Sequence, residues 1–189
     1  MKALGKYIYK KLHKQIGKGS CGSVYTSGKD WIIKFIEDNE DELNDIGPVS
    51  PEIREKEREI IDNWSKIKTG LTVIPYIKNW DGNSYRMRKL ICPCPEGELL
   101  YDALGRFLKY YPDPDHSWLP ADTHDKIREY YGEETGNFII EWFRDFIHDY
   151  NLITKEKYSV EDDIKPKNIG KDPVTGKVYC FDFIDLWCI

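Results

Sequence analysis

The first part of the chain alternates apolar and polar residues at the spacing of β-strands. Residues 12–16, 23–26 and 31–36 carry β-branched and aromatic side chains, and the turn-rich residues 27–30 separate the last two runs. Short runs of this kind bounded by Gly and Asp are typical of antiparallel hairpins. We therefore predict a strand-rich N-terminal part. Further strand-like sequence follows at 73–80 and 85–92.

Two later segments repeat apolar residues at a helical period. The first begins with Ser50 as N-cap and Pro51 in the first turn, where proline is favoured. Its apolar stripe is Ile53, Ile60, Ile61, Trp64 and Ile67. The second segment spans 138–150, and the proline-containing residues 110–120 before it are predicted to form a loop between helices. The last strands are predicted around 168–169 and 178–183.

The composition restricts the classes of protein to consider. The 189 residues include 40% hydrophobic and 14% aromatic residues, so we predict a globular fold. A net charge of -5 argues against sequence-independent nucleic-acid binding, and no stretch reaches the ~20 apolar residues of a membrane span. The N-terminus has no apolar block of signal-peptide length, so a cytoplasmic location is expected, or the host cytoplasm for a viral or effector protein.

The five cysteines predict reduced thiols and no metal site. Five is an odd number, and the spacings do not suggest a set of disulfides. Cys92 and Cys94 form a C-P-C-P sequence, but no second Cys or His pair follows at the spacing of a zinc site. Reduced thiols in a cytosolic protein are therefore the favoured interpretation.

Residues 17–24 form a glycine-rich pattern, G-x-G-x-x-G-x-V. A dinucleotide-binding site would need a helix after the third glycine, and a Walker loop would need Ser or Thr after the Gly-Lys pair. Neither condition is met, because strand-like sequence flanks the glycines on both sides. Glycines that join two strands can fold over nucleotide phosphates and offer them backbone N–H groups.

Lys34 ends the apolar run Trp31–Ile33, where an unpaired lysine is costly. Taken by itself, a lysine on an exposed strand face is the favoured interpretation, and phosphate contact is the alternative. On the helix that follows, Glu57 falls on the apolar stripe, whereas Glu55 and Glu59 point away from it. A carboxylate on a buried helix face requires a cation, so we predict an ion pair between Lys34 and Glu57.

A cluster of polar residues near the C-terminal end has the composition of a phosphoryl-transfer site. Such a site needs a carboxylate to orient the nucleophile, oxygen ligands for Mg²⁺ and a cation for the transferred phosphate. Asp163 can serve as the carboxylate, Asn168 and Asp182 as the metal ligands, and Lys165 as the cation. The alternative is a polar loop with solvated acids.

Together these motifs resemble those of the eukaryotic-type protein kinases, in order and spacing, from Gly17 to about Leu186. Residues 17–25 resemble the Gly-rich loop, Lys34 the lysine of the V-A-I-K motif and Glu57 the glutamate of helix C. Residues 85–90 resemble the strand that enters the hinge, with Met87 as gatekeeper. Residues 163–168 resemble the catalytic-loop motif D-L-K-P-E-N, and residues 182–183 resemble D-F-G.

The resemblance implies an α+β, bilobal fold with an N-lobe at 1–92 (antiparallel sheet plus helix C) and a truncated, mainly helical C-lobe at 93–189. It also implies ATP with Mg²⁺, or Mn²⁺, as cofactors, and Lys165 resembles the lysine of serine/threonine kinases. The implied catalytic residues are Asp163, Lys165, Lys34 and Glu57. The implied metal ligands are Asn168 and Asp182. The implied nucleotide-binding residues are Gly17, Lys18, Gly19, Ser20, Gly22, Val24, Lys34, Met87 and Leu90.

The chain also departs from the kinase pattern. Glu161 and Asp162 precede Asp163 where the family has H-R, and Ile184 replaces the glycine of D-F-G. The chain ends seven residues after Asp182, so no activation segment or later helices are expected, as in short kinases of bacterial effectors and bacteriophages. The prediction is a minimal serine/threonine kinase that acts on, or is activated by, a protein partner. The alternatives are a pseudokinase that binds a partner protein and a small-molecule kinase.

Overall fold

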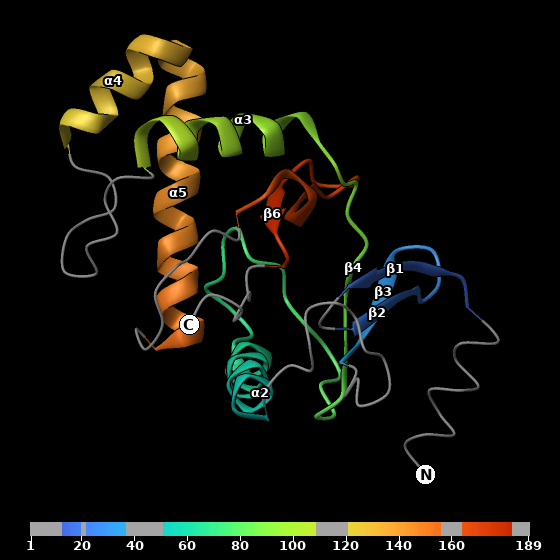
Figure 1. Ribbon diagram of the computed structural model, residues 1–189. Helices are drawn as coiled ribbons and strands as arrows, with labels where there is room; N and C mark the ends of the chain where they lie inside the picture. The colour runs from blue at the N-terminus through green and yellow to red at the C-terminus, as the bar shows by residue number, and fades with distance from the viewer. Residues whose placement is uncertain (1–12, 20–21, 37–50, 109–120, 156–163, 183–189) are drawn as a thin grey trace, which may run out of the picture. The chain divides into compact units, whose positions relative to one another are not determined.

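The computed structural model describes five stretches of the chain, namely residues 13–19, 22–36, 51–108, 121–155 and 164–182 (Figure 1). The chain divides into two compact units. The sheet unit contains residues 1–68 and 76–89, and the helical unit contains residues 69–75 and 90–189. Each unit is described by itself below.

The sheet unit is built on four antiparallel strands in the order β1-β2-β3-β4. These strands are β1 (Gln15–Gly19), β2 (Gly22–Thr26), β3 (Trp31–Ile36) and β4 (Ser84–Arg88). The strands predicted at 23–26 and 31–36 are confirmed. In the turn between them Gly28 has a φ of 81°, a conformation that residues with a Cβ rarely adopt.

Helix α2 (Pro51–Lys66) confirms the first predicted helix and packs against the sheet. Ile60, Ile61 and Trp64 of the predicted stripe are each at most 2% exposed. The ring of Trp64 lies 5.6 Å from that of Tyr85 on β4, centroid to centroid. The helix therefore forms because its apolar period has a sheet face to cover. Ser50 and the side chain of Ile53 lie outside the described residues.

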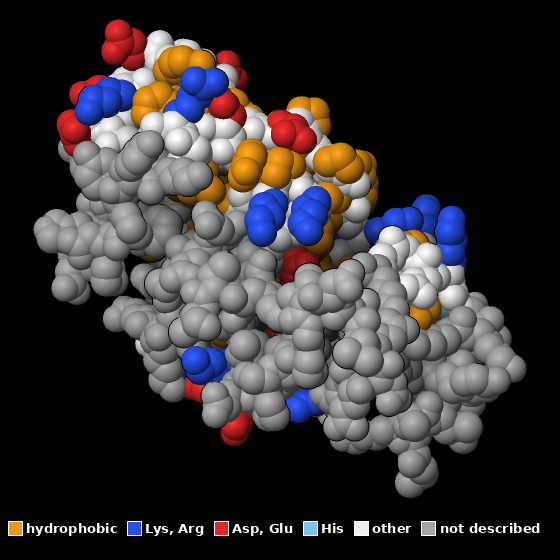
Figure 2. Space-filling model, viewed as in Figure 1, with side chains coloured by type: hydrophobic (Ala, Val, Ile, Leu, Met, Phe, Trp, Pro, Cys, Tyr) orange, Lys and Arg blue, Asp and Glu red, His pale blue; other side chains and the backbone are white. Residues whose placement is uncertain are grey.

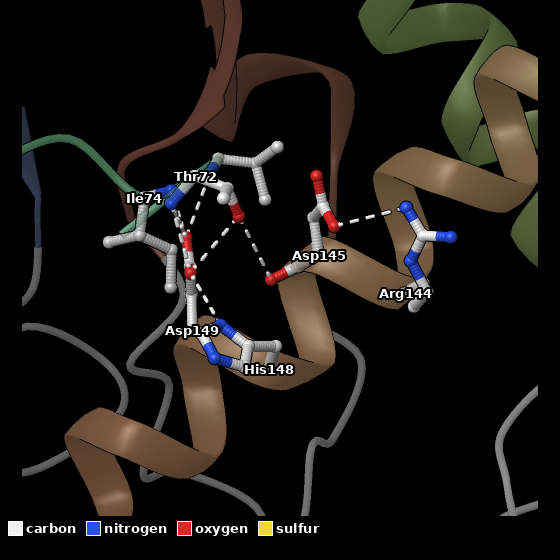
Figure 3. A network of polar contacts seen from close by, with 7 residues as sticks. Thr72, Ile74, Arg144, Asp145, His148 and Asp149 are labelled. Carbon is white, nitrogen blue, oxygen red and sulfur yellow. Dashed lines mark hydrogen bonds and ion pairs between the residues drawn. The ribbon is translucent and has the colours of Figure 1, made fainter. Parts of the chain in front are cut away.

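The strand predicted at 73–80 is wrong, because the backbone of residues 72–74 is engaged elsewhere. The N–H groups of Thr72, Val73 and Ile74 donate to the carboxylate of Asp149, at 2.7 to 3.0 Å (Figure 3). An N–H group that donates to a side chain cannot join a β-ladder. Only Lys78 forms a bridge in this stretch, opposite Arg86.

The strand predicted at 85–92 ends at Arg88, four residues early. The chain leaves the sheet there, and Ile91 exchanges two backbone hydrogen bonds with Lys171, of 2.8 and 2.9 Å, in the helical unit. Pro93 follows and has no N–H group to donate. The local sequence favours an extended chain at these positions. It does not determine which segment that chain pairs with.

The helical unit contains three α-helices and a two-stranded hairpin among its described residues. In chain order its elements are α3 (Pro95–Ala103), the π-helix η1 (Leu104–Leu108), α4 (Ala121–Tyr131), α5 (Glu133–Thr154), the 3-10 turn η2 (Pro166–Asn168), β5 (Ile169–Lys171) and β6 (Val178–Cys180). Helix α5 contains the predicted helix 138–150 and extends beyond both of its ends. The loop predicted at 110–120 lies outside the described residues.

Helix α5 lies at the centre of the core of the helical unit. Ile139, Trp142, Phe143 and Phe146 are each at most 3% exposed, and the rings of Trp142 and Phe146 stack at 5.5 Å. Helices α4 and α5 pack closely at Gly136, where an added Cβ would lie 2.8 Å from the Cα of Arg128.

The C-terminal hairpin is confirmed, with β6 shorter than the predicted strand at 178–183. Strand β5 pairs antiparallel with β6, from Ile169 opposite Cys180 to Lys171 opposite Val178. The turn between them is closed by Asp172, whose Oδ1 accepts from the N–H groups of Val174 and Thr175. The α+β class is thus confirmed, with an antiparallel sheet followed by a mainly helical unit. Across the described helices, none has the length and apolar character needed to cross a membrane.

Candidate functional site

The glycine-rich segment forms the hairpin of β1 and β2. Gly17 pairs with Val24, and the described register ends at Gly19 opposite Gly22. Lys18 pairs with Ser23 in between. The prediction that the glycines join two strands is therefore confirmed, which rules out a dinucleotide-binding strand–helix turn. Ser20 and Cys21 lie outside the described residues.

Several predicted nucleotide-binding residues share one face of the sheet. Val24 on β2 pairs with Lys34 on β3, and Lys34 pairs with Tyr85 on β4. Directly opposed residues of neighbouring strands project from the same face, as do residues two apart on one strand. Met87, which is 2% exposed and two residues after Tyr85, therefore belongs to this face with Val24 and Lys34.

Helix α2 contacts that same face through Trp64 and carries Glu57. Trp64 contacts Tyr85, the neighbour of Lys34 across the ladder. Glu57 precedes Trp64 by seven residues, about two helical turns, so both project from the same side of α2. Glu57 is 4% exposed and Lys34 is half-buried. Lys34 and Glu57 thus lie on two surfaces that pack against each other, which is the arrangement that an ion pair between them requires.

In the helical unit, backbone hydrogen bonds tie together the predicted polar residues that the structure describes. Pro166 starts the turn η2, as suits its fixed φ, and the N–H of Asn168 closes the turn on the carbonyl of Lys165 at 2.8 Å. The N–H of Phe181 donates to the carbonyl of Asn168 at 3.0 Å. Asp182 therefore directly follows a residue that is hydrogen-bonded to Asn168, although fourteen positions separate them in sequence.

These residues provide two oxygen-bearing side chains, of which Asn168 is 8% exposed and Asp182 half-buried. Within the described stretches no group of three or more His, Cys, Asp or Glu side chains could hold a metal ion. Asn168 and Asp182 would fit Mg²⁺ as a pair of side-chain ligands. Mg²⁺ is commonly bound through one or two protein side chains, and phosphates and water fill its other positions. Asp163, Glu161, Asp162 and Ile184 lie outside the described residues.

Leu90 and the two neighbouring cysteines contact the turn η2 and the start of the hairpin, residues 166–170. An added Cβ on Gly170 would lie 2.8 Å from the Cβ of Leu90, so only glycine leaves room for the leucine. The thiol of Cys92 donates to the carbonyl of Lys167 at 2.9 Å. Cys94 is buried, and burial raises the pKa of its thiol. Neither cysteine forms a disulfide.

Sequence patterns did not single out two carboxylates of the helical unit that make buried or partly buried contacts. Glu96 accepts from the Nζ of Lys171 at 2.6 Å, and this hydrogen bond lowers the pKa of Glu96. Asp149 is fully buried and accepts hydrogen bonds from four donor groups of residues 72–74. Asp149 had a detectable signal, because it falls on the apolar stripe of its helix just as Glu57 does. No sequence signal indicates the pairing of Glu96 with Lys171, because 75 positions separate the two residues.

Comparisons with known proteins leave the family open. No protein-family model matches the chain, and no curated protein matches it. Among solved structures, one similar chain is an aminoglycoside phosphotransferase in a ternary complex with streptomycin and ATP. It is 14% identical, with a TM-score of 0.38, over 97% of this chain and 70% of that one. A likeness this weak assigns neither a family nor a function.

Proposed function

We propose that the protein transfers the γ-phosphoryl group of ATP to a serine or threonine hydroxyl of a protein. Lys34, held by Glu57, binds the α- and β-phosphates, and the strands of the Gly-rich hairpin cover them. Asp163 orients the hydroxyl and accepts its proton, and Lys165 offsets the charge of the transferred group. Asn168 and Asp182 hold Mg²⁺, which supplies further neutralisation of phosphate charge.

The observation that most supports this proposal is the placement of Lys34 and Glu57. A half-buried lysine and a buried glutamate lie on packed surfaces of one unit, on the same sheet face as Val24 and Met87. A structural ion pair in a small core is often replaced by apolar residues without loss of stability. Stability alone therefore does not call for a lysine at this position, whereas phosphate binding does.

The decisive test is phosphoryl transfer from γ-labelled ATP, with and without cell lysate as a source of protein substrate. The wild-type chain should label itself or a protein in an Mg²⁺-dependent manner. Asp163→Ala, Lys34→Ala and Asp182→Ala should each reduce the initial rate by at least a hundredfold, since each removes a group that acts in transfer. Lys177→Ala and Asp122→Ala, at exposed positions, should label at the wild-type rate.

Two further measurements separate this proposal from its alternatives. Saturating Mg·ATP should raise the melting temperature, because a ligand at 100 times its Kd adds about 2.7 kcal/mol. A pseudokinase would lack transfer, and its function in cells would survive both Lys34→Ala and Asp182→Ala. A small-molecule kinase would phosphorylate alcohols or amino sugars and leave every protein in the lysate unlabelled. Either result would contradict the proposed protein substrate.

A further inference from the structure

Three cations surround one aromatic ring on the sheet face opposite to Lys34. The Nζ of Lys78 lies 4.4 Å from the centroid of the Trp31 ring, and the guanidinium carbons of Arg86 and Arg88 each lie 5.8 Å from it. Trp31 pairs with Arg88 across the ladder, so these side chains share a face. In Figure 2, Lys and Arg side chains gather over the region of β1 to β4. We call Trp31, Lys78, Arg86 and Arg88 the Trp31 cluster.

The pairing within the Trp31 cluster opposes like charges. Lys78 and Arg86 exchange both of their backbone hydrogen bonds, at 2.8 Å each, and so face each other directly. Arg88 follows Arg86 by two residues on the same face. Like charges directly opposite in a sheet are destabilising, and cation–π contacts with Trp31 offset only part of that cost. In the part of the chain that the structure describes, no ion pair joins Lys78 or Arg86 to a carboxylate.

A second observation points to an anion at the same place. The Nε atom of Arg86 is buried and has no hydrogen-bond partner. A buried donor without an acceptor is unfavourable, so native structures contain few of them. An oxyanion at the Nε edge of the guanidinium would supply the acceptor once the atoms that cover the Nε move aside, because Arg binds carboxylates and phosphates through two parallel N–H groups.

We propose that the Trp31 cluster binds a phosphate monoester carried by a phosphorylated side chain of a partner protein. Three cationic groups within 6 Å of one ring centroid match one compact dianion better than carboxylates spread along a peptide. The cluster lies on a sheet face, where a free phosphate gains few other contacts, whereas a polypeptide can contact the surrounding strands. This inference does not depend on the proposed kinase activity, because Lys34 and Glu57 belong to the other face.

The test is calorimetric binding of a short alanine-rich peptide with a central phosphoserine to the full chain. The wild type should bind it, and binding should weaken as the salt concentration rises. The double variant Lys78→Gln/Arg86→Gln should bind at least tenfold more weakly, since it loses two charge-assisted contacts. It should remain folded by circular dichroism, because the change removes a repulsion. Lys78→Arg/Arg86→Lys, which keeps both charges, should retain most of the affinity.

Matched controls make the result specific. Lys177→Gln removes a lysine that also lies over a ring, 5.6 Å from that of Tyr179, and should bind as the wild type does. Lys34→Ala should also bind normally, which separates this site from the proposed nucleotide site. Equal binding by the wild type and the glutamine double variant would refute the site. Equal binding of the unphosphorylated peptide, or of a peptide with two glutamates in its place, would refute the phosphate monoester. Inorganic phosphate that binds as tightly as the phosphopeptide would refute the protein source.

Discussion

Each unit buries one carboxylate on the apolar face of a helix, and the two are surrounded differently. In the helical unit, Asp149 is 0% exposed and accepts from three consecutive backbone N–H groups and the hydroxyl of Thr72 (Figure 3). In the sheet unit, Glu57 is 4% exposed and lies on the side of α2 that packs against β4. Burial alone would assign both side chains the same role.

The difference arises from the backbone that each carboxylate faces. Asp149 faces a loop whose N–H groups belong to no ladder, so these groups can surround the charge. Glu57 lies on the side of α2 that contacts β4, a strand whose backbone groups pair with β3, and we propose Lys34 as its cationic partner. A buried acid that is satisfied by backbone groups holds the fold together. For Glu57 the proposed role differs, namely to hold Lys34 in place for a ligand.

The largest expected effect is the loss of stability in Asp149→Ala. This change leaves the N–H groups of residues 72–74 without their acceptor, and each such group costs about 1–3 kcal/mol. We expect the free energy of unfolding, measured by urea titration with circular dichroism, to fall by about 3–5 kcal/mol. Asp149→Asn, which keeps one carbonyl oxygen, should fall by less.

Asp145→Ala is the matched control, because Asp145 lies one turn earlier on α5, with its side chain 35% exposed and paired with Arg144 at 3.5 Å. Surface changes of this kind alter stability by about 0.5 kcal/mol or less. If Asp149→Ala and Asp145→Ala unfold at the same urea concentration, the loop is not held by Asp149, and the proposed contrast with Glu57 fails.

Glu57→Gln should show the opposite behaviour. It removes the negative charge that is proposed to position Lys34 but keeps the shape of the side chain, so the free energy of unfolding should change by about 1 kcal/mol or less. Phosphoryl transfer should fall tenfold to a hundredfold, which corresponds to about 1.4–2.8 kcal/mol in the activation free energy. Glu55→Gln, at an exposed position of the same helix, is the control for both measurements. A variant that unfolds easily yet transfers phosphate normally would make Glu57 structural, as Asp149 is.

The sequence predicted those elements whose reason for forming is local. Strands β2 and β3 and helix α2 were found because alternation and a helical period are visible within a few residues. The strand predicted at 73–80 was wrong because the partner of residues 72–74 is Asp149, 75 to 77 positions away. A local window gives the preference of a segment, but not which donors and acceptors reach it in the fold.

In the candidate site, too, local patterns could be predicted and long-range contacts could not. Lys34 and Glu57 were paired by periodicity, and the sheet register with the packing of α2 supplies the facing surfaces that such a pair needs. The same periodicity would have identified Asp149 as a buried acid, though not its backbone partners. The contact of Leu90 with Gly170 was invisible, because it depends on which segments pack together rather than on either segment alone. The role of Asp163 stays a prediction.

A third carboxylate, Glu96, provides the smallest expected effect and a check on the electrostatic part of the comparison. Its side chain is 25% exposed, and its hydrogen bond with Lys171 lowers its pKa. A lowered pKa in the folded state means that stabilisation is present above the ordinary pKa of a glutamate and is lost as the pH falls through the lowered value. At neutral pH, Glu96→Gln should therefore reduce the free energy of unfolding by up to about 1 kcal/mol, a small effect because the pair is partly exposed.

The difference between wild type and Glu96→Gln should shrink towards zero in urea titrations at progressively lower pH, because both side chains are then neutral. Asp122→Asn is the control, since Asp122 pairs with Lys126 at 3.2 Å with both side chains more than 60% exposed. It should differ little from the wild type at any pH. A Glu96→Gln difference that stays constant with pH would show that the side chain acts through packing. In that case a neighbouring cation would contribute nothing measurable to the stability of the fold through the charge of a partly buried acid. The same reasoning would weaken the role proposed for Lys34 and Glu57.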